Sequence, residues 1–154
     1  MSFARAKRLD VVLRLRRMTE ERATLELAAA AGRLAQARAG REIALRRLAA
    51  EEAWLSDLQV RTATGGEFAS ATTCISSADE MVEAAGRAIS AASDTVFDAR
   101  ARLAEATKAR SVVERLRDRA LEAARLEAER REIAELGELA GVRHAWHVIS
   151  GESS

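Results

Sequence analysis

The sequence contains no proline and no tyrosine, and it has only three Phe, two Trp and eight Gly among 154 residues. With so few large aromatic side chains, there is little around which a compact globular core can be centred. The chain is built largely from Ala, Leu, Glu and Arg, the strongest helix formers. The composition therefore predicts long helices whose apolar residues form a thin seam.

Uncharged apolar runs of about 18 residues, which a membrane-spanning helix requires, are also missing. The basic N-terminal segment lacks the apolar stretch of a secretory signal, because Arg14, Arg16 and Arg17 interrupt it. A single Cys74 cannot form an intrachain disulfide, and its place beside an apolar column favours a packing role. We expect a cytoplasmic protein with at most a peripheral contact to the inner face of the cell membrane.

Patterns that carry catalysis or bind metals are absent from the sequence. There is no Gly-rich phosphate loop after a strand, no zinc-spaced ligand cluster and no nucleophilic triad in a folded pocket. His144 and His147 lie three residues apart near the C-terminus, where we expect them to be unliganded. We predict that the protein is not an enzyme and has no catalytic residue, cofactor or metal site.

What the sequence does contain is a pair of heptad columns on each side of one break. Before the break, one column reads Leu13, Glu20, Leu27, Leu34, Arg41, Leu48 and Leu55, and the other reads Leu9, Arg16, Ala23, Ala30, Ala37, Ala44, Glu51 and Leu58. After it, one column reads Ile75, Val82, Ile89, Val96 and Leu103, and the other reads Ala78, Ala85, Ala92, Ala99, Ala106, Val113 and Ala120. Such repeats predict a coiled coil.

The break lies at residues 62–66, where Gly65 and Gly66 make continuation of the helix costly. We predict an all-α, long antiparallel two-helix coiled-coil hairpin: helix one over about 4–61, a turn over about 62–70 and helix two over about 71–140, forming a rod roughly 85 Å long. A homodimer of two unbroken helices is the alternative.

The end of the second helix is expected to be irregular. Beyond Val113 the seam drifts through Leu116, Ala120, Ala123 and Leu126 to Ile133 and Leu136, which predicts a stutter. Gly137 and Gly141 then provide helix stops, and residues 142–154 form a flexible tail.

The net charge of +1 conceals an uneven distribution along the chain. Residues 1–17 carry six basic and one acidic side chain, and residues 100–131 carry ten basic and six acidic ones. Residues 62–99 carry one basic and six acidic side chains. A hairpin would thus be positive at its open end and negative at its turn, and the acidic residues among the basic ones argue against nucleic acid as a partner.

Two stretches resemble the FliJ family of flagellar and injectisome export proteins: LDVVLRLRR at residues 9–17 and RSVVERLRDRALEAARLEAERREIAELGE at residues 110–138. The resemblance implies a hairpin similar to the central stalk of rotary ATP synthases. Its open end would insert into the hexameric export ATPase, and the protein would also contact the cytoplasmic domain of the export gate and export chaperones. An acidic pore would suit the positive tip.

By the same resemblance, specific residues acquire expected roles. The expected ATPase-binding residues are Arg14, Arg16, Arg17, Arg115, Arg117 and Arg119. The expected gate-binding residues are Leu48, Leu55, Ala78, Met81 and Ala85. Many members carry tyrosines in the second half of helix one, whereas this chain has only Trp54 as an aromatic residue there.

Two other functions are compatible with the same residues. A homodimeric coiled coil could act as a structural spacer or adaptor. Alternatively, residues 1–18 could act as a basic amphipathic helix on a membrane surface.

Overall fold

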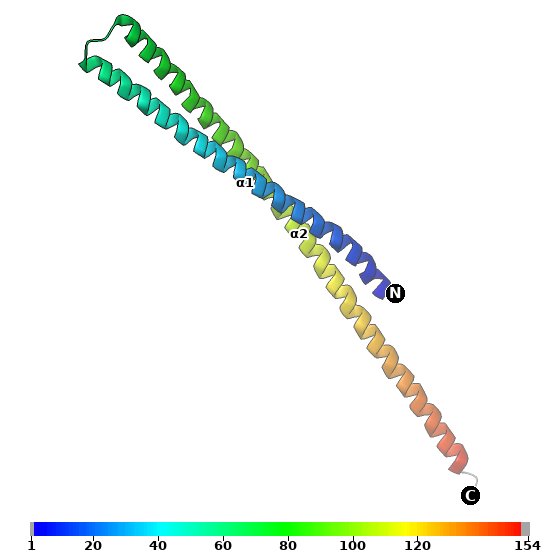
Figure 1. Cartoon of the computed structure of the whole chain (residues 1–154). Coiled ribbons are helices and arrows are strands. Elements are labelled where there is room, and N and C mark those ends of the chain that lie inside the picture. Colours follow the sequence, from blue (N-terminus) through cyan, green and yellow to red (C-terminus); the bar gives the residue numbers. More distant parts are fainter. Residues whose placement is uncertain (1, 152–154) are drawn as a thin grey trace. The chain divides into compact units, whose positions relative to one another are not determined.

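The structure is a computed structural model that describes residues 2–151 and consists of two helices, α1 (Ser2–Val60) and α2 (Gly65–Gly151) (Figure 1). Only residues 61–64 of the described chain lie outside the helices. The all-α two-helix hairpin expected from the sequence is thus confirmed. Of the expected tail, residues 152–154 lie outside the described part.

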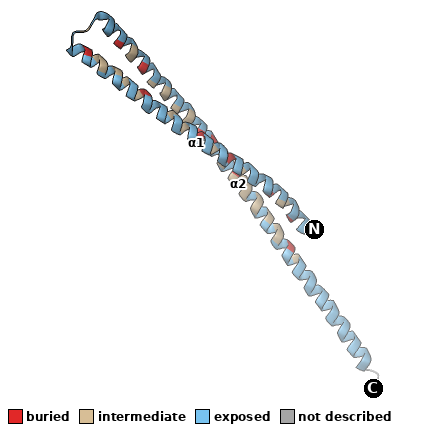
Figure 2. Ribbon diagram, viewed as in Figure 1, coloured by how far each residue is buried: buried red, intermediate tan, exposed pale blue. Residues whose placement is uncertain are grey.

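The chain divides into two compact units, each built from a segment of both helices. We call residues 20–106 the turn unit, and residues 1–19 with 107–154 the terminal unit. In the turn unit, residues 20–60 of α1 pack antiparallel to residues 65–106 of α2, and the buried residues lie along their contact (Figure 2).

The core of the turn unit is a thin seam, as the heptad columns predict. Ala30, Val96 and Ala99 form a buried cluster against which Leu27 and Leu34 pack. The register of the two helices is marked by Arg102, whose guanidinium lies 3.4 Å from the Glu26 carboxylate. Alanine at these positions leaves room for the two helix backbones to approach closely.

The two columns of α2 are buried or half-buried throughout the range in which they were expected, from Ile75 to Ala120. The columns of α1 are less regular, because Arg16 and Arg41 occupy heptad positions but are exposed. Their long charged side chains reach solvent, so the seam is interrupted on the α1 side at these two levels.

The turn differs from the expected one in its range and in its cause. It comprises residues 61–64, and Gly65 and Gly66 already belong to the first turn of α2, with no positive φ at any described glycine. Thr64 and Glu67 form a capping box: the Thr64 amide donates to Glu67 Oε2 at 2.8 Å, and the Glu67 amide donates to Thr64 Oγ1 at 3.2 Å. The start of α2 is therefore fixed by this cap and does not depend on glycine flexibility.

The predicted stutter after Val113 is wrong, because the heptad register continues unchanged into the terminal unit. Arg110, Arg117 and Ala124 continue the column that contains Leu103, and each is half-buried or buried. The residues of the expected drift, Leu116, Ala123 and Leu126, are exposed instead. Two arginines thus occupy positions that are aliphatic in the turn unit.

The predicted helix stops are also wrong, since α2 continues through Gly137 and Gly141 to Gly151. A single glycine inside a helix costs only about 1 kcal/mol relative to alanine, and the neighbouring residues are strong helix formers. Ion pairs one turn apart, Arg125 with Glu129 and Arg131 with Glu127, also support this segment. Every residue from 128 to 151 is exposed.

Candidate protein-binding site

The positive charge expected at one end of the hairpin is concentrated in the terminal unit. Residues 1–19 and 107–154 carry fifteen basic and ten acidic side chains, a net charge of +5. The turn unit carries ten basic and fourteen acidic side chains, a net charge of −4. An anionic partner would therefore be attracted to the terminal unit.

Arg117 lies in the seam of the terminal unit and connects the two helices. Its Nε lies 2.6 Å from Oδ1 of Asp10 on α1, and its Nη1 lies 3.3 Å from Oδ1 of Asp118. The hydrogen bond that Arg117 donates to Asp10, together with the negative charge of that carboxylate, raises the pKa of Arg117 above its ordinary value. Arg117 is therefore engaged in ion pairs within the chain, and its side chain is not freely available to another protein.

A second connection between the helices lies about one turn away. Glu114 accepts contacts from Arg17 on α1 at 3.3 Å and from Arg110 on its own helix at 2.6 Å. Together with the Asp10–Arg117 pair, this connection places residues 10–17 of α1 opposite residues 114–117 of α2.

The other four expected ATPase-binding arginines, Arg14, Arg16, Arg115 and Arg119, are exposed. None of them forms an ion pair with a residue that the structure describes. The pairs above place Arg14 and Arg16 at about the level of Arg115 on the neighbouring helix. The structure thus separates the six arginines into four that are free to bind a partner and two, Arg17 and Arg117, that hold the helices together.

The residues expected to bind the export gate lie in the turn unit, and most belong to its seam. Ala78 is 0% exposed and cannot touch a partner while the helices are packed, so its expected contact is incompatible with this structure. Leu48, Leu55 and Ala85 are half-buried. Met81 is exposed, and its Sδ accepts a hydrogen bond from Arg47 at 3.5 Å.

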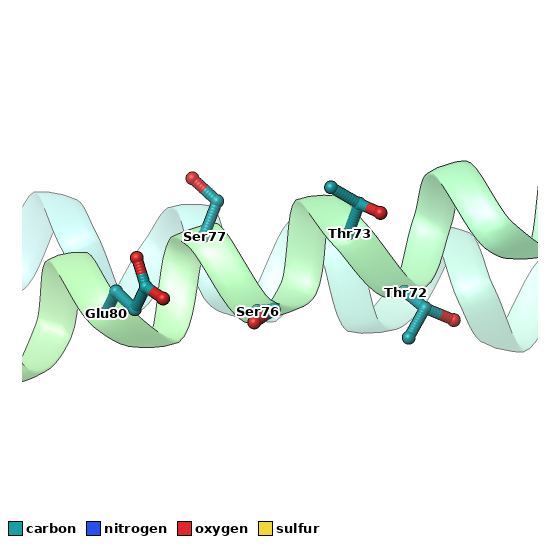
Figure 3. Close-up of a pocket in the computed structure, with 5 residues that line it drawn as sticks. All are labelled: Thr72, Thr73, Ser76, Ser77 and Glu80. Atoms are coloured by element: carbon teal, nitrogen blue, oxygen red, sulfur yellow. The ribbon is translucent and has the colours of Figure 1, made fainter.

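The helix surface carries open depressions. One is lined by Thr72, Thr73, Ser76, Ser77 and Glu80, all on the same stretch of α2 (Figure 3). The Thr72 and Thr73 hydroxyls donate to backbone carbonyls one turn earlier, at 2.9 and 3.0 Å. These hydroxyls are satisfied by their own helix, so the depression resembles an ordinary helix surface.

The single cysteine and the two histidines do not form part of a catalytic or metal-binding cluster among the described residues. Cys74 is half-buried beside the seam, and His144 and His147 are exposed on the last turns of α2. Within residues 2–151, no group of three or more His, Cys, Asp or Glu is placed to hold a metal ion. Neither helix, over the residues described, has a stretch long and apolar enough to cross a membrane.

Sequence reasoning missed Asp10, Arg110 and Glu114, which form the ion pairs of the terminal unit. The signal was present in the heptad column itself, because Arg110 and Arg117 follow Leu103 at intervals of seven. A charged residue in such a column needs a partner across the seam, and Asp10 supplies it for Arg117.

A family sequence model described as "Flagellar FliJ protein" matches residues 5–147. The match covers both helices and nearly the whole chain. The chain belongs to the FliJ family. Comparisons with curated proteins and with solved structures found no match. Membership confirms the resemblance seen in the sequence and indicates a component related to flagellar export.

Proposed function

We propose that this FliJ-family protein is a non-enzymatic stalk that binds the hexameric flagellar export ATPase through its terminal unit. The observation that carries the proposal is the set of four exposed, unpaired arginines, Arg14, Arg16, Arg115 and Arg119, on a unit of net positive charge. Arginine keeps its charge when partly desolvated and can bind carboxylates with two parallel hydrogen bonds. A pore lined with carboxylates is the complementary surface.

The ion pairs inside the terminal unit support this role by limiting the motion of the two helices. Asp10 with Arg117, and Glu114 with Arg17, connect α1 to α2 at the level of the exposed arginines. A partner would then meet arginines on a preorganised pair of helices, which lowers the entropic cost of binding.

The test compares two charge reversals that are matched in number. Arg115→Glu with Arg119→Glu changes two exposed residues of the terminal unit, and Arg33→Glu with Arg38→Glu changes two exposed residues of the turn unit. We expect the first pair to lower recovery of the purified ATPase in a pull-down at least tenfold, and the second to lower it less than twofold. Recovery of the native protein should fall as salt rises. Equal recovery of both variants would contradict the proposal.

The further partners proposed for the protein are the cytoplasmic domain of the export gate and export chaperones. For the gate, we propose a contact centred on exposed Met81, to which half-buried Leu48, Leu55 and Ala85 add only their accessible atoms. Ala78 is excluded because it is buried. Binding of the gate domain should weaken in Met81→Asp and persist in Ile43→Asp, an exposed control on α1.

We also propose that the protein acts in the cytoplasm as a monomeric hairpin. The alternative, a homodimeric spacer or adaptor, differs in its mass in solution. Sedimentation equilibrium should give 16.7 kDa for the monomer, and twice that value would favour the spacer.

A further inference from the structure

The N-terminal part of α1 has an apolar ridge on the face that points away from the seam. Ala6, Leu9 and Leu13 are buried or half-buried against α2, so they define the inner face. Val11, Leu15 and Met18 follow one another at spacings of four and three residues and therefore share the opposite face. Their exposed fractions are 54%, 59% and 64%.

Basic side chains flank this ridge on both sides. Lys7, Arg8 and Arg14 each lie three or four residues from Val11, which makes them its neighbours on the helix surface. Lys7 and Arg14 form no ion pair with any residue from 2 to 151. We call the six residues Lys7, Arg8, Val11, Arg14, Leu15 and Met18 the outer face of α1.

Of the acidic groups of α1, only Glu21 borders the outer face, three residues beyond Met18. Asp10 is the one acidic residue between positions 1 and 19, and its carboxylate is held by Arg117 on α2. Of the α2 acids at this level, Glu114 and Asp118 are likewise engaged by arginines. A binding partner therefore has to supply negative charge and also accept aliphatic side chains.

We propose that the outer face of α1 binds the surface of a bilayer containing anionic phospholipids. At such a surface, aliphatic side chains enter the boundary between headgroups and acyl chains, while the long stems of Lys and Arg let their charges stay among the phosphates. A second copy of the chain would bring like charges together. A protein groove is disfavoured because the ridge has no aromatic anchor of the kind that dominates protein interfaces.

This inference is independent of the proposed ATPase contact but shares Arg14 with it. One helix face cannot lie on a bilayer and inside a protein ring at the same time. If both proposals are correct, purified ATPase should compete with vesicles for the protein. If only the ATPase proposal fails, vesicle binding should remain and the competition should be absent.

The test is co-sedimentation of the full chain with vesicles of phosphatidylglycerol and phosphatidylcholine, compared with vesicles of phosphatidylcholine alone. We expect at least tenfold stronger binding to the anionic vesicles, weakening as salt rises. Val11→Ser with Leu15→Ser and Met18→Ser should reduce binding to anionic vesicles at least tenfold. Lys7→Gln with Arg8→Gln and Arg14→Gln should do the same.

The matched control is Ile43→Ser with Val60→Ser and Phe97→Ser, which removes three exposed apolar side chains from other parts of the helices. This variant should bind anionic vesicles within twofold of the native protein, and circular dichroism should show native helix content in all variants. The proposal is overturned if the native chain does not bind, if it binds both kinds of vesicle equally, or if the apolar triple variant binds normally. Loss of ATPase binding in that variant without any vesicle binding would identify the face as a protein-docking surface instead.

Discussion

At the scale of single residues, the role expected for Arg117 from the sequence differs from the role that its contacts indicate. Its position in an arginine-rich stretch suggests a partner-binding residue, whereas its contact with Asp10 makes it part of the seam. Arg115 and Arg119, two residues away on either side, are exposed and form no ion pair within the part of the chain that the structure describes. Neighbouring arginines therefore differ in their surroundings: Arg117 contributes to the seam, whereas Arg115 and Arg119 are accessible to a partner.

This division predicts opposite outcomes for two adjacent charge reversals. Arg117→Glu places a carboxylate beside Asp10 and should lower the melting temperature by several degrees, because like charges then meet in the seam. Arg115→Glu should leave the melting temperature nearly unchanged. The exchange Asp10→Arg with Arg117→Asp should recover most of the loss, as followed by circular dichroism. An unchanged melting temperature in Arg117→Glu would show that the pair adds nothing to stability.

The capping box makes a second prediction at this scale. Thr64→Ala removes the acceptor of the Glu67 amide and should lower the free energy of unfolding by about 0.5 to 2 kcal/mol. Gly66→Ala should raise it by about 0.4 to 1 kcal/mol, because φ is not positive and an added Cβ would lie 3.9 Å from Thr64 Oγ1. Urea titrations would measure both changes. A loss of stability in Gly66→Ala would indicate that the turn does depend on the conformational freedom of glycine.

At the scale of the helices, the heptad columns determine which face of each helix is buried. The small column on α2 brings Ala78, Ala99 and Ala106 into the seam, and each is buried. Where the other column of α2, which contains Leu103, is continued by Arg110 and Arg117, ion pairs replace aliphatic packing. The seam therefore has an apolar part in the turn unit and a more polar part in the terminal unit.

The small column should not tolerate larger side chains. Ala99→Leu adds bulk beside Ala30 and Val96 and should cost about 1 to 3 kcal/mol of unfolding free energy. Ala101→Leu, at an exposed position two residues away, is the control and should have little effect. Equal stability of the two variants would mean that the register is misassigned.

The buried faces of the helices were predictable from the sequence where a strong heptad repeat coincided with few helix-breaking residues. From Ile75 to Ala106 both columns repeat without a charged residue, so the burial of their members could be predicted correctly. The buried face of α2 beyond Val113 could not be predicted in this way. Leu116 and Leu126 have the side chains of seam residues, but both are exposed because α1 packs on a different face of α2. Gly137 and Gly141 were wrongly expected to end α2. The free-energy cost of a single glycine inside a helix is too small to stop the helix on its own.

At the scale of the whole molecule, the sequence indicated the charge distribution but not which charges are available. Counting residues places the excess of positive charge in the segments that form the terminal unit. Only side-chain geometry reveals that Arg17 and Arg117 are paired and that Arg14, Arg16, Arg115 and Arg119 are free. Among the expected gate-binding residues, Ala78 is buried and Met81 is exposed, a difference that a resemblance to a family does not report.

We propose that the terminal unit, and not the turn unit, contacts the export ATPase. Site-specific photo-crosslinking tests it directly, with a benzophenone side chain placed at position 119 or, as a control, at exposed position 41 on α1. Irradiation with the assembled hexamer should give an adduct from position 119 and almost none from position 41, with the adduct mapped to residues that line the pore. An adduct from position 41 alone, or equal adducts from both positions, would show that the ATPase does not bind the terminal unit selectively.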